Sequence, residues 1–122
     1  MTQIINPKQE KKYDLEGRCL TFAKRVNTYV RNLPRDIPNI ENGKQLVRSA
    51  GSIGANYIEA NESLSRKDFA MRIKISRKEA RESEFWLELT EPLKEFEREK
   101  PSLLQESTEL RKIFGSILEK TK

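Results

Sequence analysis

The stretch SRKDFAMRIKISRKEARESEFWLELT, residues 65–90, repeats an apolar or small side chain at alternating spacings of four and three positions. Seven positions keep this rhythm without a break: Phe69, Ile73, Ser76, Ala80, Ser83, Leu87 and Thr90. Such spacing places these side chains along one side of an α-helix, as in the buried seam of a helical bundle. Ser65 and Asp68 form an acidic variant of the capping box, which predicts the start of the helix. Pro92 is expected to kink or end it.

Three further segments carry the same rhythm and predict three more helices. The first is expected to start at Asp14 and to run to about residue 33, with this seam: Leu15, Cys19, Phe22, Val26, Tyr29 and Leu33. The next is expected to be capped by Asn39 or Asn42, after a loop framed by Pro34 and Pro38, with this seam: Leu46, Ala50, Ile53, Tyr57, Ala60 and Leu64. The last is expected to start at Pro101 and Ser102, with Ser102 and Gln105 as a capping box and this seam: Leu103, Ser107, Leu110, Phe114 and Ile117.

The short connections between these segments favour antiparallel neighbours, so the sequence predicts an all-α, up-down-up-down four-helix bundle. The length of 122 residues suits one core, and we expect a single domain over residues 14–122 after a flexible N-terminal arm, residues 1–13. Small residues cluster from Ser49 to Ala55 and face the small middle of the 65–90 seam. These two helices should therefore pack closely, and Gly51 and Gly54 indicate the close approach of another backbone.

Composition argues against several classes of protein. No apolar run approaches the roughly 20 residues of a membrane span, and the N-terminus lacks an apolar signal segment. Cys19 is the only cysteine, so a cytoplasmic protein without internal disulfides is expected. The chain has no histidine, which excludes the usual di-iron, Cys/His zinc and Ser/His catalytic sites. We therefore expect no enzyme activity, cofactor or metal, and we interpret Cys19 as a small buried hydrophobic residue.

Charge is distributed unevenly along the chain, which carries a net charge of +5. Residues 66–81 hold seven Lys or Arg against two Asp or Glu, whereas residues 82–100 hold three against seven. This asymmetry is typical of a site for a polyanion or of head-to-tail packing between subunits. A solvated helix face explains it equally well.

A basic ridge follows from the spacing within residues 65–90. Lys67, Lys74, Lys78 and Arg81 fall on one outward stripe with Arg77 beside it, and Lys24, Arg25 and Arg31 lie on the outer face of the first helix. Such cations would neutralise the phosphates of RNA or DNA without reading their sequence. The alternative is a soluble surface with local ion pairs, Lys78 with Glu82 and Asp68 with Arg72.

Two further groups of residues are candidates for binding. A second apolar stripe, which one core cannot easily use, is predicted to form an interface with sister subunits or another partner: Phe85, Trp86, Leu89, Leu93 and Phe96. Asn56 and Glu59 lie three positions apart and share a helix face. They form either a binding pair or a buried structural pair whose ion partner is Arg48 or Arg77.

The middle of the chain resembles a known family. The matching residues are Gln45–Ala50, QLVRSA, then residues 52–60, SIGANYIEA, followed by Lys67-Asp68-Phe69 and the C-terminal stretch 109–113, ELRKI. They resemble the four-helix bundle proteins, also called the 23S rRNA-intervening sequence protein family, over most of residues 14–120. This chain departs from the family pattern at Gly54, where proline is common, and at Ala60, where glycine is common.

The resemblance implies a left-handed bundle that assembles into a homopentamer. Family members are encoded within insertions in ribosomal RNA genes or stand alone. A related branch, the accessory variability determinant of diversity-generating retroelements, binds a reverse transcriptase and is implied to contact nucleic acid. Two hypotheses follow: a non-enzymatic homo-oligomeric scaffold that contacts RNA or DNA through the basic ridge, as an accessory to an enzyme such as a reverse transcriptase, or a purely structural protein–protein interaction module.

Overall fold

The computed structural model describes residues 14–122, which contain four α-helices and no strand. The helices are α2 (Leu15–Arg31), α3 (Ile37–Asn61), α4 (Arg66–Leu89) and α5 (Glu99–Lys120), and a short 3-10 helix, η1 (Lys94–Phe96), precedes α5. The predicted N-terminal arm, residues 1–13, lies outside the described residues.

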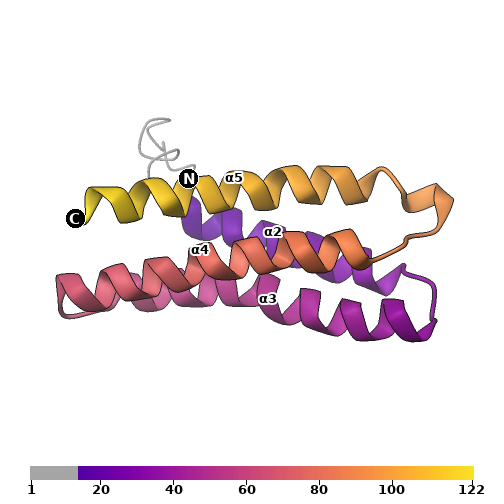
Figure 1. The fold of residues 1–122 in the computed structure, drawn as a ribbon, viewed down its shortest axis with the longest axis horizontal. Coiled ribbons are helices and arrows are strands. Elements are labelled where there is room, and N and C mark those ends of the chain that lie inside the picture. The colour runs from indigo at the N-terminus through magenta and orange to yellow at the C-terminus, as the bar shows by residue number, and fades with distance from the viewer. Residues whose placement is uncertain (1–13) are drawn as a thin grey trace, which may run out of the picture.

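Consecutive helices run in opposite directions and form an antiparallel bundle (Figure 1). Extensive contacts join α2 to α3, α3 to α4 and α4 to α5, and α5 closes the ring by packing on α2. This arrangement confirms the predicted all-α four-helix bundle. It also places α2 and α4 at diagonal corners, so their outward faces look to opposite sides of the molecule.

The predicted seams form the core. The fully buried positions comprise Cys19, Phe22, Val26, Leu46, Ala50, Ile53, Ile73, Ala80, Leu87, Leu103, Leu110 and Phe114. Phe69, Tyr57 and Ile117 are half-buried and pack against this cluster. Leu64 is the exception: it was expected in the α3 seam, but α3 ends at Asn61 and Leu64 is fully exposed in the turn before α4.

Buried hydroxyl groups join the helices at the small positions of the α4 seam. Ser49 and Ser83 share a hydrogen bond of 2.9 Å between α3 and α4, and the Ser76 hydroxyl donates to the Ile53 carbonyl over 2.9 Å. The Ser107 hydroxyl of α5 donates to the carbonyl of Ala80 over 2.8 Å. A serine hydroxyl reaches the backbone of a neighbouring helix only when the two helices lie close together. The predicted close packing of α3 and α4 is therefore confirmed.

Gly51 and Gly54 of α3 have different surroundings from those expected. A Cβ atom at Gly54 would lie 3.1 Å from the Cβ of Cys19, so Gly54 allows the approach of α2 rather than α4. A Cβ atom at Gly51 would meet nothing within 4 Å, because this glycine lies on the exposed side of α3. The interpretation of Gly51 as a site of close backbone approach is thus wrong for the single subunit.

The helix starts agree with the sequence only in part. Ser65 caps α4, since its hydroxyl accepts a hydrogen bond of 3.0 Å from the backbone N–H of Asp68. For α3 the predicted caps are wrong: Asp36 accepts from the N–H of Asn39 over 2.9 Å, and Pro38 lies in the first turn, where its missing N–H costs nothing. Asn39 is instead buried and bonds the backbone of Glu91 beyond the end of α4.

The last helix also starts earlier than expected. It begins at Glu99 without a side-chain cap, and the predicted capping box of Ser102 and Gln105 is wrong. The hydroxyl of Ser102 accepts a hydrogen bond from Arg25 of α2 over 2.8 Å instead. Helix α4 stops at Leu89, and Thr90 is its extended C-cap. Pro92 therefore lies just beyond the end of α4 and does not kink it.

The contrast between Gly51 and Gly54 gives a matched pair of substitutions. Gly51→Ala should raise the free energy of unfolding by about 1 kcal/mol, because alanine favours the helix and its methyl group meets no neighbour. Gly54→Ala should give no such gain, because the added methyl group collides with Cys19, which is fixed in the core. Urea denaturation measures both, and equal gains would contradict the assigned orientation of α3.

The burial of Cys19 predicts an inert thiol. Burial is the main cause that raises the pKa of Cys19 to about 12, so the reactive thiolate is nearly absent at pH 8 and appears only as the pH approaches that value. Labelling with Ellman's reagent at pH 8 should be roughly a hundredfold slower for the native protein than in denaturing urea. Complete labelling of the native protein within the mixing time would show that the thiol is accessible.

Candidate functional site

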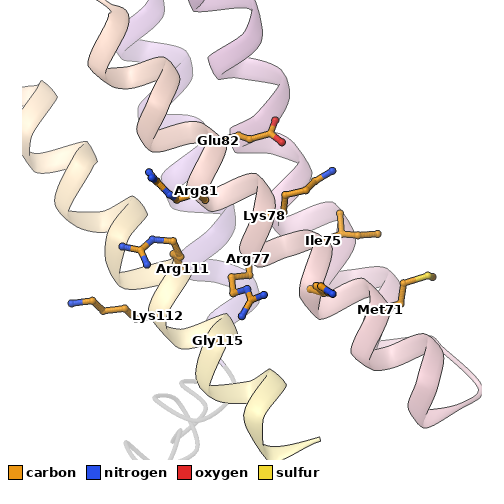
Figure 2. A pocket seen from close by; sticks show the side chains of 10 residues that line it. Met71, Ile75, Arg77, Lys78, Arg81, Glu82, Arg111, Lys112 and Gly115 are labelled. Atoms are coloured by element: carbon orange, nitrogen blue, oxygen red, sulfur yellow. The ribbon is translucent and has the colours of Figure 1, made fainter. Parts of the chain in front are cut away.

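Residues on the outer side of α4 and on the neighbouring face of α5 line an open groove of about 690 Å³. Four cations of α4 line it, Lys74, Arg77, Lys78 and Arg81, together with Arg111 and Lys112 of α5. Figure 2 shows Arg77 and Arg81 on the side of α4 that faces α5, with Arg111 of α5 near them. The Lys112 side chain extends from α5 away from α4, and Lys78, Ile75 and Met71 lie on the side of α4 away from α5. We call this surface the basic groove.

Positive charge in the basic groove is largely uncompensated. Arg111 pairs with Glu84, whose Oε2 lies 2.6 Å from the Arg111 Nε, and Thr108 also donates to Glu84. The other five cations form no ion pair with any residue of the described chain, 14–122: Lys74, Arg77, Lys78, Arg81 and Lys112. Several like charges on one concave surface attract a polyanion.

Outside the groove, four arginines pair with carboxylates of a neighbouring helix: Arg18, Arg25, Arg48 and Arg72. Arg18 of α2 contacts both Glu106 and Glu109 of α5 at 2.7 Å, and these two carboxylates raise the pKa of Arg18. Hydrogen bonds from Gln105 and then from Arg18 lower the pKa of Glu109. The ion pairs of Arg18 with Glu106 and Glu109 join α2 to α5. The basic groove differs because most of its cations have no such structural partner.

The local pairs that would have neutralised the ridge are not formed. Glu82 lies one helical turn after Lys78, but its carboxylate contacts the Arg48 guanidinium of α3 at 3.2 Å. Arg72 likewise contacts Asn56 and Glu59 of α3 instead of pairing with Asp68. Pairs between helices have replaced pairs along α4, so the predicted pairs of Lys78 with Glu82 and of Asp68 with Arg72 are wrong.

The cations of α2 lie apart from the basic groove. Lys24 and Arg31 are exposed, and Arg25 contacts Glu99, at 3.4 Å, as well as Ser102. Because α2 is diagonal to α4, the predicted set of nucleic-acid contacts divides between two sides of the bundle. Sequence reasoning missed Arg111 and Lys112, although both flank the α5 seam and α5 follows α4 in an antiparallel bundle.

The predicted interface stripe is not one patch. Phe85 is 54% exposed and Leu89 44%, both on the outer side of α4, and Leu93 follows in the connection to η1. Trp86 is half-buried against the core, with its ring edge-on to Phe85 at a centroid distance of 5.1 Å. Phe96 turns away and lines a hollow beside α2 with Thr21 and Tyr29, among others.

The Asn56–Glu59 pair is held by Arg72 of α4, and neither predicted ion partner contacts it. Arg72 donates to Asn56 over 3.1 Å and lies 4.0 Å from the carboxylate of Glu59, which is largely exposed. The amide of Asn56 donates to the Ser52 carbonyl over 2.9 Å. Asn56 thus links α3 to α4, and the interpretation of the two residues as a buried pair is wrong, because Asn56 is half-buried and Glu59 is exposed.

The predicted partner Arg48 serves another carboxylate, Glu79, which is buried between α3 and α4. Arg48 lies 3.5 Å from the Glu79 Oε2. The Glu79 Oε1 and the Trp86 Nε1 have no hydrogen-bond partner among residues 14–122. Across residues 14–122 we find no group of three His, Cys, Asp or Glu side chains placed to hold a metal ion. None of the helices described is long and apolar enough to span a bilayer.

Comparisons with known proteins agree with this architecture. The model of the family described as 23S rRNA-intervening sequence protein matches residues 11–116. The chain is also similar to a protein of unknown function from the S23 ribosomal protein family of Bacteroides thetaiotaomicron VPI-5482, whose crystal structure was solved at 1.70 Å. The two are 34% identical with a TM-score of 0.73, and the match covers 86% of this chain and 95% of that one. No curated protein matches.

The family match covers α2, α3 and α4 completely and most of α5. It includes the segments QLVRSA and SIGANYIEA, whose small residues build the α3–α4 contact, and the α5 segment that lines the basic groove. The similar crystal structure supports the same helical fold at an identity high enough to indicate kinship. This chain therefore belongs to the 23S rRNA-intervening sequence protein family.

Proposed function

We propose that this protein is a non-enzymatic, homo-oligomeric scaffold that binds the phosphate backbone of RNA or DNA in the basic groove. The observation that carries the proposal is that Arg77 and Arg81 of α4 and Lys112 of α5 line one groove, and none of the three has a carboxylate partner in residues 14–122. Like charges gathered around one groove without carboxylate partners favour an anionic ligand from outside the chain.

The chemistry of the groove favours backbone contacts over base recognition. Arginine and lysine side chains neutralise phosphates and release counterions, which gives affinity that depends strongly on salt. The groove lining contains no aromatic side chain on which a base could stack. We therefore expect weak discrimination between sequences. A nucleic-acid enzyme such as a reverse transcriptase, implied by the family resemblance, would supply any sequence choice.

The groove predicts a specific loss of binding. Neutralising Arg81 and Lys112 together, as Arg81→Gln and Lys112→Gln, should weaken binding of single-stranded RNA about tenfold at low salt, because each exposed ion pair contributes up to about 1 kcal/mol. The slope of log affinity against log salt should fall by about 1.4, or about 0.7 for each lost phosphate contact. Fluorescence anisotropy at several salt concentrations measures both.

Lys24 and Arg31 of α2 provide the matched control for this experiment. Lys24→Gln with Arg31→Gln removes the same charge from the opposite side of the bundle and should leave affinity within about twofold once long-range charge is screened. Affinity that does not depend on salt, or equal losses in the two double variants, would reject the groove as the binding site.

A second candidate function is a purely structural protein–protein interaction module. The exposed apolar side chains of Phe85 and Leu89, one turn apart on α4, favour it, because large exposed apolar residues that lie together mark interaction surfaces. The homopentamer implied by the family resemblance is consistent with self-association through this surface. In this candidate the basic groove has no ligand, and self-association alone accounts for the exposed residues.

Self-association through Phe85 can be tested without disturbing the core. Phe85→Ser should lower the average mass in multi-angle light scattering with little change in thermal stability, because the side chain is more than half exposed. Leu20→Ser on α2 removes a similarly exposed side chain from the other side and should leave the mass unchanged. A wild-type protein that is monomeric at all concentrations would reject the homo-oligomer.

A further inference from the structure

Gly115 of α5 forms part of the floor of the basic groove. It is half-buried inside the helix, and Figure 2 shows Arg77 of α4 beside it. A Cβ atom at this position would lie 3.7 Å from the Cδ atom of Arg77, which is ordinary van der Waals contact, and no other atom of a neighbouring helix within residues 14–122 comes within 4 Å. Packing within the described chain therefore does not require glycine here.

The missing side chain of Gly115 leaves the space above the α5 backbone open. Glycine weakens a helix relative to alanine, because its backbone loses more freedom on folding. Gly54 has a packing reason for this weakness, since its missing Cβ atom admits Cys19. At Gly115 the space that is kept free belongs to the basic groove, and glycine is the residue that allows a ligand to approach a backbone closely.

The width of the basic groove suits one strand of nucleic acid. The Ser107 hydroxyl reaches the Ala80 carbonyl at 2.8 Å, so α4 and α5 lie in direct contact, with axes about 8–10 Å apart. A double helix, whose major groove alone is about 12 Å wide, is too broad to enter between them. It can reach only the outer edges of the groove, where Lys78 and Lys112 extend. A single strand can lower its phosphates to the floor at Gly115.

The cations of α4 extend over the length of a short strand. Lys74 and Arg81 are seven positions apart, which is about 10 Å along a helix, and Arg77 lies between them. Stacked nucleotides follow one another at about 3.4 Å, so this length accommodates about four phosphates.

The hollow between α4 and α5 continues beyond Arg81 with the opposite charge. Glu84 and Glu88 line this second part, and Arg81, which lines both parts, is the only Lys or Arg among its described lining residues. Glu84 pairs with Arg111, but the Glu88 carboxylate forms no ion pair within residues 14–122. An unpaired carboxylate repels phosphates, which favours the end of a bound strand at Arg81.

We propose that a single-stranded segment of RNA or DNA, about four nucleotides long, lies in the basic groove with its phosphates over Gly115 and ends at Arg81. The inference rests on the function proposed above and names the kind of nucleic acid and its path. It predicts a preference opposite to that of charge alone. A duplex has the higher charge density, so a basic surface without depth would bind the duplex more tightly.

Filling the groove without changing its charge tests the inference. At physiological salt the wild type should bind a single-stranded RNA of about twelve nucleotides at least about threefold more tightly than the duplex of that length. Gly115→Leu should weaken single-strand binding about tenfold and duplex binding less than about twofold, because the leucine occupies the floor and leaves the edges unchanged. Gly51→Leu adds the same side chain on the exposed side of α3 and should change neither affinity. Fluorescence anisotropy measures each affinity.

Glu88→Lys tests where the strand ends. The change should raise the affinity for a strand of about eight nucleotides at least about threefold more than for one of about four nucleotides, which fits between Lys74 and Arg81. Glu16→Lys makes the same charge change on α2, diagonal to α4, and should alter both affinities equally and by less than about twofold at physiological salt.

The outcomes separate this inference from the proposed function. If the wild type binds RNA with strong salt dependence but prefers the duplex, or if Gly115→Leu weakens neither form or both equally, no single strand lies over Gly115 and the groove remains a simple basic surface. Equal gains for both strand lengths in Glu88→Lys would show that the strand does not end at Arg81. If the wild type binds neither form, the proposed function fails together with the inference. Thermal unfolding, expected to be no lower for Gly115→Leu than for the wild type because leucine is the stronger helix former, shows that the fold is retained.

Discussion

The buried seam of α4 is the constraint on which the rest of the structure depends. Its small members, Ser76, Ala80 and Ser83, let α3 and α5 approach until serine hydroxyls bond to backbone carbonyls and to each other. Each of these hydrogen bonds contributes about 1 kcal/mol, and a buried hydroxyl without its partner would cost about 1–3 kcal/mol. Rotating α4 about its axis would break all three at once. The seam therefore fixes which residues of α4 face α5 and which face outward.

The functional surfaces follow from that fixed rotation. With the seam inward, Arg77 and Arg81 lie toward α5 and line the basic groove together with Arg111 and Lys112, while Met71, Phe85 and Leu89 are exposed to solvent. The same helix turns other charges toward α3, where Arg72, Glu79 and Glu82 take part in contacts with α3 residues. Charge on α4 is thus sorted by direction: the ion-paired residues face α3, and the cations without ion pairs face α5 or solvent.

Sequence periodicity predicted those features that depend on one helix at a time. The α4 seam, the Ser65 cap and the antiparallel order all follow from spacing and from short connections. The errors arise where a neighbouring helix decides the outcome. Ser102 matches the capping-box pattern, but its hydroxyl accepts a hydrogen bond from Arg25 of α2 instead. Gly54 packs against Cys19 of α2 rather than against α4. Likewise, Arg72 holds Asn56 because antiparallel packing brings residues sixteen positions apart together.

The candidate site shows the same division. The α4 cations of the basic groove were predicted, since one helix carries them at regular spacing, but α5 contributes Arg111 and Lys112 from a segment with no unusual charge. The α2 cations were grouped with the ridge because sequence alone does not say which helices are diagonal. Phe96 was grouped with Phe85 for the same reason, although the chain turns between them at Pro92 and carries it to the α2 side.

The most direct test of the account is a map of backbone amide chemical shifts on addition of a short single-stranded RNA. The fixed rotation of α4 predicts that perturbations concentrate at Arg77, Arg81, Lys112 and Gly115, around the groove between α4 and α5. The amides of Lys24 and Arg31, on the diagonal helix, should stay unchanged. Perturbations centred on α2, or spread evenly over every basic residue of the chain, would contradict the claim that the α4 seam builds the binding site.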